Sequence, residues 1–236
     1  MLKFLNQTYR QTRELFKIEK LELNQGEFVV LFGANGTGKS TWLKSIVRPV
    51  TNDFQIDGKS AKGLTQLELA RNIAFVDNHF YGLDHLRVSE YISLGRYPYT
   101  GISGILGETD KKVLERITSK LQIEHLLDKS TSELSDGERQ RCNIARTLIQ
   151  ETPVILLDEP TSFLDYPSKI ELFQLLLDIS RTENKLVIVS THDIDMGLEY
   201  ATSWCIISSD REFIYKTETL SKTELLELGF KGKIKQ

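Results

Sequence analysis

The stretch "GANGTGKST", residues 33 to 41, matches the pattern G-x-x-x-x-G-K-[ST] and follows the apolar run "FVVLF" of residues 28 to 32. Glycines let such a loop curl so that successive N–H groups point at phosphate oxygens, and a helix starting after Gly38 adds the positive end of its dipole. In this pattern Lys39 reaches the β- and γ-phosphates and the Ser40 hydroxyl binds Mg²⁺. We therefore expect a nucleotide-binding loop formed by Gly33, Ala34, Asn35, Gly36, Thr37, Gly38, Lys39, Ser40 and Thr41.

The segment "VILLDEP", residues 154 to 160, predicts the other half of a nucleotide site. Its apolar start indicates a buried strand, which would deliver Asp158 to the carboxyl end of a sheet, where such sheets bind ligands. Asp158 can hold the Mg²⁺ shell there, and Glu159 can polarise an attacking water as a general base. The alternative is two acids that simply end a strand, and the phosphate loop upstream weakens that alternative.

Four short apolar runs predict the fold class. They are "FVVLF", "NIAFV" (72–76), "PVILL" (153–157) and "KLVIVS" (185–190), and helical patterns separate them. Such spacing is typical of βαβ units, whose strands are covered by helices on both faces. The sequence therefore predicts an α/β fold, a phosphate-loop NTPase core with a mainly parallel sheet.

Two other stretches alternate apolar and polar residues, as strands with one wet face do. "LFKIEKLELNQGEF" (15–28) contains a turn at Gln25-Gly26, and "WCIISSDREFIY" (204–215) has the same character. Each predicts an antiparallel hairpin. We expect the first to form an antiparallel β subdomain near the N-terminus.

The middle of the chain, from about 80 to 149, shows helical periodicity and loops without a convincing buried strand. Within it, "GRYPYTGISGILGETD" (95–110) is rich in glycine and aromatic residues and predicts an exposed loop between two helical stretches. We expect a single domain over residues 1–236. Its nucleotide-binding core would take up about 1–77 and 151–236, and a helical subdomain would take up about 78–150.

Composition excludes several classes of protein. With 40% hydrophobic and 27% charged residues and a net charge of −3, the chain resembles neither a disordered protein nor a basic nucleic-acid binder. No apolar run approaches the roughly 20 residues that cross a bilayer, and the start lacks a signal-peptide pattern, so we expect a cytoplasmic protein. Cys142 and Cys205 have no CxxC spacing and are expected to be reduced thiols.

Three further motifs complete a set that resembles the ATP-binding cassette (ABC) ATPases over nearly the whole chain. They are "LSDGERQR" (134–141), "TSFLD" (161–165) and "VSTHD" (189–193). The resemblance implies that the nucleotide is ATP, that Asp165 belongs to the D-loop, and that His192 is the switch histidine. It implies catalytic roles for Lys39, Glu159 and His192.

The resemblance also implies a head-to-tail dimer of two copies. Each ATP would lie between the phosphate loop of one copy and the signature of the other, which contributes Ser135, Gly137 and Glu138. Such a dimer is two-fold symmetric. Ser135 and the first N–H groups of the signature helix would then donate hydrogen bonds to the γ-phosphate across the interface.

The signature departs from the LSGGQ-like family pattern, because Asp136 and Glu138 stand where glycine and glutamine are usual. A carboxylate near the γ-phosphate would repel it unless it points away or binds a cation. "SDGE" also matches the S-x-x-E capping box, with Ser135 as the N-cap. We expect Asp136 to face solvent or the helical insert, Glu138 to cap the helix, and Ser135 with Gly137 to meet ATP.

Two more assignments follow from position in the family pattern. In "AFVDNHF" (74–80), Asn78 stands at the place of a glutamine, and its carbonyl can contact Mg²⁺ directly or through a water. An aromatic residue upstream of the phosphate loop usually stacks on adenine in this family. Tyr9 is the candidate by position; Phe16 is also near, and a core role for either remains open.

The segment "LRVSEYISLGRYPYTG" (86–101) resembles the "TVxExVxxGRxPY" segment of ATPase subunits of importers for iron-siderophore complexes, haem and cobalamin. Exposed aromatics such as Tyr97 and Tyr99 would suit the docking of a short partner helix, and ordinary packing within the insert is the alternative. The resemblance implies an ATP-hydrolysing subunit at the cytoplasmic face of the membrane. It also implies integral membrane permease subunits that dock near residues 78–101 and an extracytoplasmic substrate-binding protein.

Three other functions remain open on the sequence. A soluble ABC ATPase acting on nucleic acid or ribosomes would be expected to show a coiled-coil insertion, a second cassette or a basic stripe. A small-molecule kinase would need neither a signature nor a D-loop. A nucleotide-gated interaction protein that barely hydrolyses ATP is suggested by Asn78 and the acidic signature, whereas Glu159 and His192 argue against it.

Overall fold

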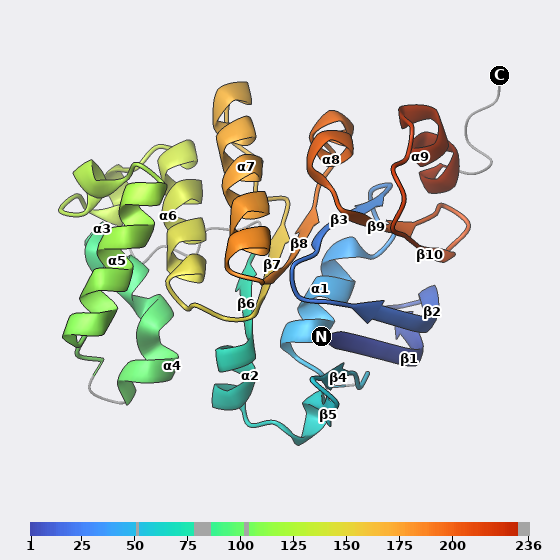
Figure 1. The fold of residues 1–236 in the computed structure, drawn as a ribbon, viewed down its shortest axis with the longest axis horizontal. Helices are drawn as coiled ribbons and strands as arrows, with labels where there is room; N and C mark the ends of the chain where they lie inside the picture. Colours follow the sequence, from blue (N-terminus) through green and yellow to red (C-terminus); the bar gives the residue numbers. More distant parts are fainter. Residues whose placement is uncertain (51, 78–85, 102–103, 231–236) are drawn as a thin grey trace.

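Two β-sheets organise the chain in a computed structural model that describes residues 1–50, 52–77, 86–101 and 104–230 (Figure 1). The six-stranded sheet has the order β10-β9-β3-β8-β7-β6 and the four-stranded sheet the order β2-β1-β4-β5. The larger sheet contains β3 (Phe28–Gly33), β6 (Ile73–Val76), β7 (Val154–Asp158), β8 (Leu186–Ser190), β9 (Ser203–Ile207) and β10 (Phe213–Lys216). The smaller sheet contains β1 (Leu2–Arg10), β2 (Glu14–Leu23), β4 (Gln55–Ile56) and β5 (Lys59–Ser60).

The larger sheet is parallel except at one edge. β3 pairs in parallel with β8 and β9, and β7 pairs in parallel with β6 and β8, whereas β10 pairs antiparallel with β9. Every residue of β3, β7 and β8 is buried, which explains why these strands read as unbroken apolar runs. The predicted α/β fold with a mainly parallel sheet is confirmed, as is the predicted hairpin near the C-terminal end.

The smaller sheet corrects one predicted hairpin. β2 pairs antiparallel with β1, with Leu2 opposite Leu23 and Phe4 opposite Leu21. The turn at Gln25-Gly26 therefore closes no hairpin, because the next strand, β3, enters the larger sheet. The alternating pattern belongs to β2 alone, since a strand buried on both faces such as β3 cannot share a wet face with it.

Helices fill the space between the sheets and cover the outer face of the larger one (Figure 1). α1 (Lys39–Val47) lies between the sheets, where Trp42 packs 5.7 Å from the ring of Phe4 and shares a core with Leu31. The opposite face is covered by α7 (Tyr166–Thr182), α8 (Ile194–Tyr200) and α9 (Lys222–Gly229), while α2 (Gln66–Asn72) leads into β6. This layering brings the ends of β3, β7 and β8 together beside α1.

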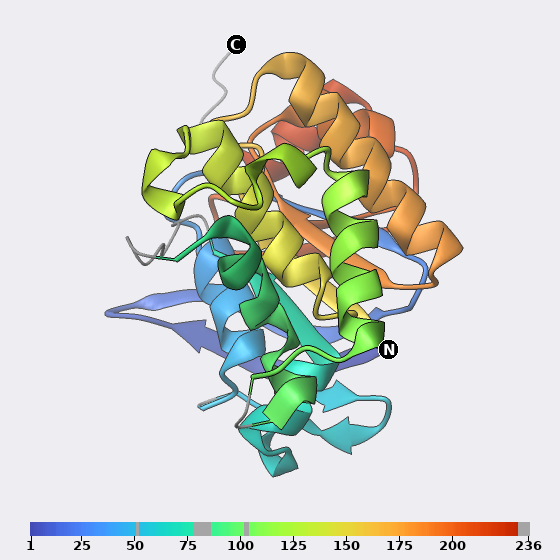
Figure 2. The ribbon, with the colours of Figure 1, turned by 90° about the vertical axis from the view of Figure 1, so that its left-hand side faces the viewer.

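The helical part of the chain lies beyond the β6 edge of the large sheet (Figure 2). It contains α3 (Val88–Ser93), α4 (Tyr97–Thr100), α5 (Glu108–Lys120) and α6 (Asp136–Leu148). The expectation of an exposed loop over 95–110 is wrong in its first part, because Leu94–Arg96 form a 3₁₀ turn and α4 follows directly. Gly95 is buried because α6 packs closely against this turn, and a Cβ there would lie 2.0 Å from the Arg146 carbonyl oxygen.

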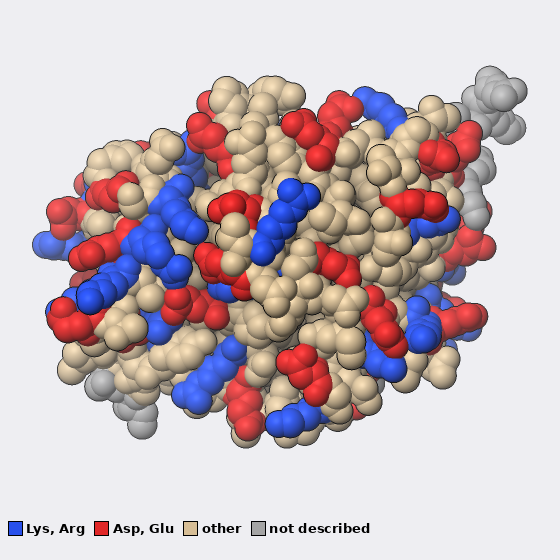
Figure 3. Space-filling view, viewed as in Figure 1, with Lys and Arg blue, Asp and Glu red and all other residues tan. Residues whose placement is uncertain are grey.

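The surface carries both signs of charge. On the face seen in Figure 3, Lys and Arg side chains lie beside Asp and Glu side chains over the helices. Among the described residues, no helix is both long enough and apolar enough to span a bilayer.

Candidate functional site

The phosphate loop connects β3 to α1 through backbone conformations that require glycine. Gly38 has φ 109° and occupies the N-cap of α1, where a Cβ would also meet Leu15 and Phe16 at 3.0 Å. At Gly33, a Cβ would lie 2.5 Å from the carbonyl oxygen of Ile207. The loop is closed by Thr37, whose hydroxyl donates to Ala34 O at 2.9 Å. Asn35 and Gly36 at its tip are exposed, while Ser40 and Thr41 stand half-buried in the first turn of α1.

Lys39 lies folded over this loop. Its side chain donates to Gly33 O at 2.8 Å and to Ala34 O at 3.4 Å, and the residue is buried. Burial lowers the pKa of the ammonium group, and the nearby carboxylates of Glu159 and Asp158 oppose that shift. The same ammonium therefore lies within the electrostatic reach of the two acids, so the fold brings the phosphate loop and the end of β7 into one site.

Asp158 fits a cation site. It is fully buried at the end of β7, and its Oδ1 accepts from the Ser190 hydroxyl at 2.6 Å. Its Oδ2 has no hydrogen-bond partner among the described residues. A buried carboxylate oxygen without a partner is costly unless it meets a cation or a water held by one. The same residues offer no group of three His, Cys, Asp or Glu side chains. The unpaired oxygen of Asp158 suits Mg²⁺, which binds through one or two protein oxygens plus phosphates and waters.

Glu159 and His192 face each other across the ends of β7 and β8. His192 Nε2 lies 2.7 Å from Glu159 Oε1, and both side chains are partly exposed. Glu159 has the left-handed φ of 49°, and its N–H donates to Ser190 Oγ at 3.0 Å. The Ser190 hydroxyl thus donates a hydrogen bond to the Asp158 carboxylate and accepts one from the backbone N–H of Glu159. Ser190 was not predicted from sequence, although its place at the start of "STHD" was the available signal.

The signature forms the start of α6 as expected. Ser135 is the N-cap and accepts from Glu138 N at 3.3 Å, while Glu138 Oε2 accepts from Ser135 N and from Ser135 Oγ, each at 2.8 Å. These bonds lower the pKa of Glu138. Asp136 points to solvent with its side chain 69% exposed, 3.5 Å from Arg139. The predicted capping box and the outward Asp136 are confirmed; the contact of Ser135 and Gly137 with ATP stays a prediction.

The D-loop and the signature helix touch within one copy. Gln140 on α6 donates to the carbonyl oxygen of Pro160, the residue that follows Glu159, at 2.9 Å. A Cβ at Gly137 would lie 3.4 Å from Phe163 O. Asp165 caps α7 by accepting from Ser168 N at 3.0 Å, and this bonding lowers its pKa. Gln140 was also missed from sequence, because a polar residue inside a helix gives no sign of the carbonyl that it will meet.

The ring of Tyr9 lies in the core of this fold, which favours the core role over stacking on adenine. Its side chain is only 2% exposed, its ring packs against Phe16 at 4.8 Å, and burial raises its pKa to about 12. The core role left open in the sequence is therefore favoured for both aromatics: Tyr9 lies on β1 and Phe16 on β2, and both belong to the core that includes Trp42 of α1. A cavity of about 120 Å³ does adjoin the loop, lined by Arg13, Leu15, Ala34, Asn35, Gly36, Thr37, Ser208, Ser209 and Arg211. Asn78 lies outside the described residues.

Comparison with known proteins agrees with this geometry. The family model described as ABC transporter matches residues 16–162. An uncharacterized ABC transporter ATP-binding protein of Methanocaldococcus jannaschii is 38% identical over 210 residues, which cover 87% of this chain and 72% of that protein. The probable siderophore transport system ATP-binding protein YusV of Bacillus subtilis is 34% identical over 194 residues, covering 81% of this chain and 70% of that protein.

Among solved structures, a dimeric bacterial ABC transporter cassette superposes with a TM-score of 0.79 at 28% identity, covering 93% of this chain and all of the other. The family match extends over the phosphate loop, the acids of β7 and the signature. The chain therefore belongs to the ABC transporter family, as one of its ATP-hydrolysing cassettes.

Proposed function

We propose that this chain is the ATP-hydrolysing subunit of an importer for iron-siderophore complexes, haem or cobalamin. The observation that carries the hydrolytic part is the meeting of Lys39, Asp158 and the Glu159–His192 pair at the end of the parallel sheet. The cargo class is supported by the 86–101 segment and by the siderophore relative of Bacillus subtilis. Located at the cytoplasmic face of the membrane, the subunit would use ATP to drive separate membrane proteins.

The residues have distinct parts in hydrolysis. Glu159 takes a proton from the attacking water as its oxygen bonds to the γ-phosphorus and the bond to the leaving ADP oxygen breaks. His192, 2.7 Å away, keeps the carboxylate in place, and Lys39 offsets negative charge on the β- and γ-phosphates. Ser40 and Asp158 would hold Mg²⁺, which supplies charge neutralisation at the phosphates.

A second copy would complete the site. In Figure 1, α6 lies to the left of the large sheet and α1 beneath its centre. Ser135 is the N-cap of α6, and Lys39 is the first residue of α1. One copy alone therefore offers its signature to a different nucleotide from the one on its own loop. The dimeric cassette that this fold matches supports the pairing of two copies, and the proposed pairing is head-to-tail.

A groove on the helical part suits a membrane partner. It has a volume of about 410 Å³ and is lined by Ser89, Glu90, Ser93, Leu94, Tyr97, Thr100, Gly104, Leu106 and Leu114. Leu94 and Tyr97 are 48% and 60% exposed, which is unusual for apolar side chains that share one groove. A short amphipathic helix of a permease subunit would bury them. An extracytoplasmic substrate-binding protein would deliver the cargo to such a complex.

The acidic signature favours one alternative, a nucleotide-gated interaction protein with weak hydrolysis. The hydrogen of the Ser135 hydroxyl is donated to Glu138, so γ-phosphate must compete for it. The Glu159–His192 pair opposes this alternative, because a protein that only binds ATP needs no base beside the phosphate.

The deciding experiment measures oligomeric state and turnover together. The Glu159→Gln variant should bind ATP and pass from monomer to dimer in light scattering behind a sizing column, while its turnover falls at least about a hundredfold. Glu171→Gln, on the exposed side of α7, is the matched control and should behave as the parent. If Glu159→Gln hydrolyses ATP as fast as the parent, the assignment of Glu159 as the base is wrong. If the parent binds ATP without turnover, the nucleotide-gated interaction protein is the better hypothesis.

A further inference from the structure

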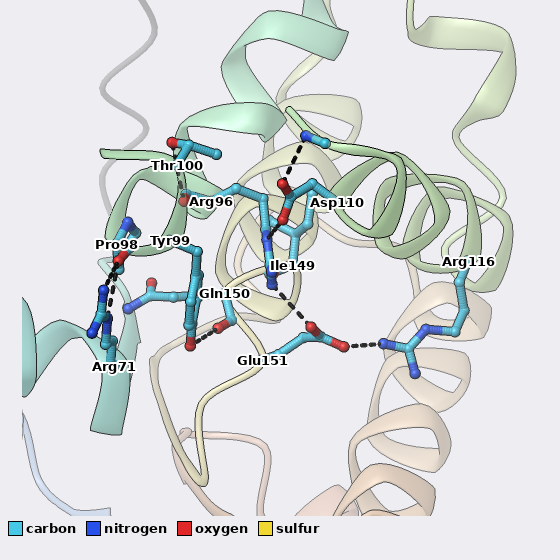
Figure 4. A network of polar contacts seen from close by, with 11 residues as sticks. Arg71, Arg96, Pro98, Tyr99, Thr100, Asp110, Arg116, Ile149, Gln150 and Glu151 are labelled. Atoms are coloured by element: carbon cyan, nitrogen blue, oxygen red, sulfur yellow. Dashed lines mark hydrogen bonds and ion pairs between the residues drawn. The ribbon is translucent and has the colours of Figure 1, made fainter. Parts of the chain in front are cut away.

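Arg96 is a buried arginine at the centre of the helical part of the chain (Figure 4). Its side chain is 7% exposed and forms ion pairs with Asp110 at 2.7 Å and Glu151 at 2.9 Å. One of its terminal nitrogens also donates to Ile149 O at 2.9 Å. One guanidinium group therefore joins the turn at Leu94–Arg96, the first turn of α5 and the segment that follows α6.

An aromatic ring stacks on this guanidinium group. Tyr99 lies with its ring centre 4.3 Å from the guanidinium carbon of Arg96, and its hydroxyl donates to Gln150 O at 2.9 Å. On the other side of α4, Arg71 of α2 donates two hydrogen bonds to Pro98 O, at 2.9 and 3.0 Å. α4 is thus attached on one side to the end of α6 and on the other to α2.

The outer shell of this network is more exposed. The second oxygen of Glu151 pairs with Arg116 at 2.6 Å, and Arg116 is 43% exposed. Exposed pairs of this kind contribute little to stability, whereas removing one partner of a buried ion pair is strongly destabilising. The bonds of Arg96 are therefore the ones that decide whether the network holds together.

The two faces of segment 94–100 make different contacts. Leu94, Tyr97 and Thr100 line the apolar groove, whereas Arg96 and Tyr99 turn inward to the residues that follow α6. At its other end, α6 begins with the signature at Ser135. The 13 residues of α6 span about 20 Å, so the groove and the signature lie near opposite ends of one helix.

We propose that Arg96 is a positioning residue that fastens the groove segment to the signature helix, so that the two move as one body. This inference rests on the proposed function, in which a membrane partner occupies the groove and ATP from a second copy meets the signature. A displacement at the groove then reaches Ser135 through packed and bonded elements without a change inside α6.

The chemistry explains why an arginine is needed. Its planar fork reaches a carboxylate, a second carboxylate and a carbonyl at once and still offers a flat face to Tyr99. A lysine at this position would keep the charge yet could not make all of these contacts from one nitrogen. Arg96→Lys therefore separates the bridge from the charge, and Arg96→Met removes both.

The test measures a distance within one copy. Spin labels are placed at Tyr97→Cys in the groove and at Ser132→Cys just before the signature; Cys142 and Cys205 are buried and should stay unlabelled. In the Glu159→Gln background, diluted with unlabelled protein, the distance distribution should be narrow and unchanged between the nucleotide-free and ATP-bound states. Arg96→Met should widen the distance distribution about twofold, because the groove segment can then move independently of α6.

Two controls separate bridging from general stability. Arg116→Gln breaks the exposed ion pair with Glu151 without touching Arg96, and its distribution should match the parent's. Arg96→Lys should recover part of the thermal stability lost in Arg96→Met while the distribution stays wide. The proposal is overturned if Arg96→Met keeps the narrow distribution, or if the distance in the parent changes on ATP binding. Should the parent fail to dimerise with ATP, the proposed function is wrong, and the nucleotide-free distributions still decide the role of Arg96.

Discussion

Replacing Glu138 by glutamine isolates what the carboxylate does at the signature. Glu138 accepts two bonds of 2.8 Å from Ser135, and its other oxygen lies 3.5 Å from Lys129. A neutral amide weakens both bonds and loses the favourable interaction with the first turn of α6. Because Ser135 remains the N-cap and glutamine can still complete a capping box, the cost is at most the roughly 1 kcal/mol of a lost cap, which for a chain of this length lowers Tm by at most about 2–4 °C.

The chain contains a matched control at the start of α9. There Glu224 accepts from Ser221 N at 2.8 Å and from Ser221 Oγ at 2.7 Å, in the same capping box. Glu224→Gln should lower Tm in the same direction and leave ATP turnover unchanged. Glu138→Gln should in addition raise turnover, by no more than about tenfold, because the Ser135 hydroxyl becomes easier to share and one carboxylate leaves the γ-phosphate region.

The assays are thermal unfolding and phosphate release under saturating ATP. The pKa of Glu138 is lowered by its bonds to Ser135, so its stabilisation is present above the ordinary glutamate value of 4.5 and is lost as the pH falls through the lower value in the folded protein. The Tm difference between parent and Glu138→Gln should therefore shrink in acid. The reasoning fails if Glu138→Gln changes turnover far beyond tenfold, or if Glu224→Gln changes turnover as much.

Three further predictions concern single side chains. Without ligand, Asp158→Asn should leave Tm unchanged or higher, because a buried charge whose Oδ2 has no hydrogen-bond partner among the described residues is removed. The substitution should also abolish the rise in Tm that Mg²⁺ and ATP give the parent, measured by thermal unfolding with and without them. Tyr9→Leu, which removes the aromatic ring, should keep the ATP affinity of the folded variant within about twofold in a fluorescent-nucleotide titration, since the ring is buried in the core, and a loss of tenfold or more would contradict this. Gly95→Ala should lower the free energy of unfolding by about 1–3 kcal/mol in urea, because its Cβ would lie 2.0 Å from Arg146 O; an unchanged urea midpoint would show that α6 can shift without cost.

The parallel core could be predicted from sequence because its signal is local. A strand buried on both faces must be apolar throughout, so "FVVLF" and "KLVIVS" identify β3 and β8 without knowledge of their partners. The capping box at the signature was predictable for the same reason, since its bonds join residues three apart.

The errors all concern partners that are distant in sequence. The alternation in residues 15–23 identifies a strand, but it does not say that β1 rather than β3 is its neighbour. The glycine-rich stretch at 95–110 suggested a loop. Gly95 is instead required by the nearby carbonyl of Arg146, which lies in another helix and cannot be identified from the local sequence. Tyr9 was chosen because it precedes the phosphate loop in the sequence, yet its ring packs against Phe16 and α1 in the core.

The left-handed backbone of Glu159 has a consequence for protein engineering. A non-glycine residue with φ near 49° is strained by roughly 1–3 kcal/mol, and glycine or asparagine would adopt this conformation more readily. A library screened for heat resistance alone would therefore enrich replacements at position 159 and collect robust proteins that no longer hydrolyse ATP. Any thermostable version of this cassette needs that position held fixed, with gains in Tm sought on surfaces remote from the ends of β7 and β8.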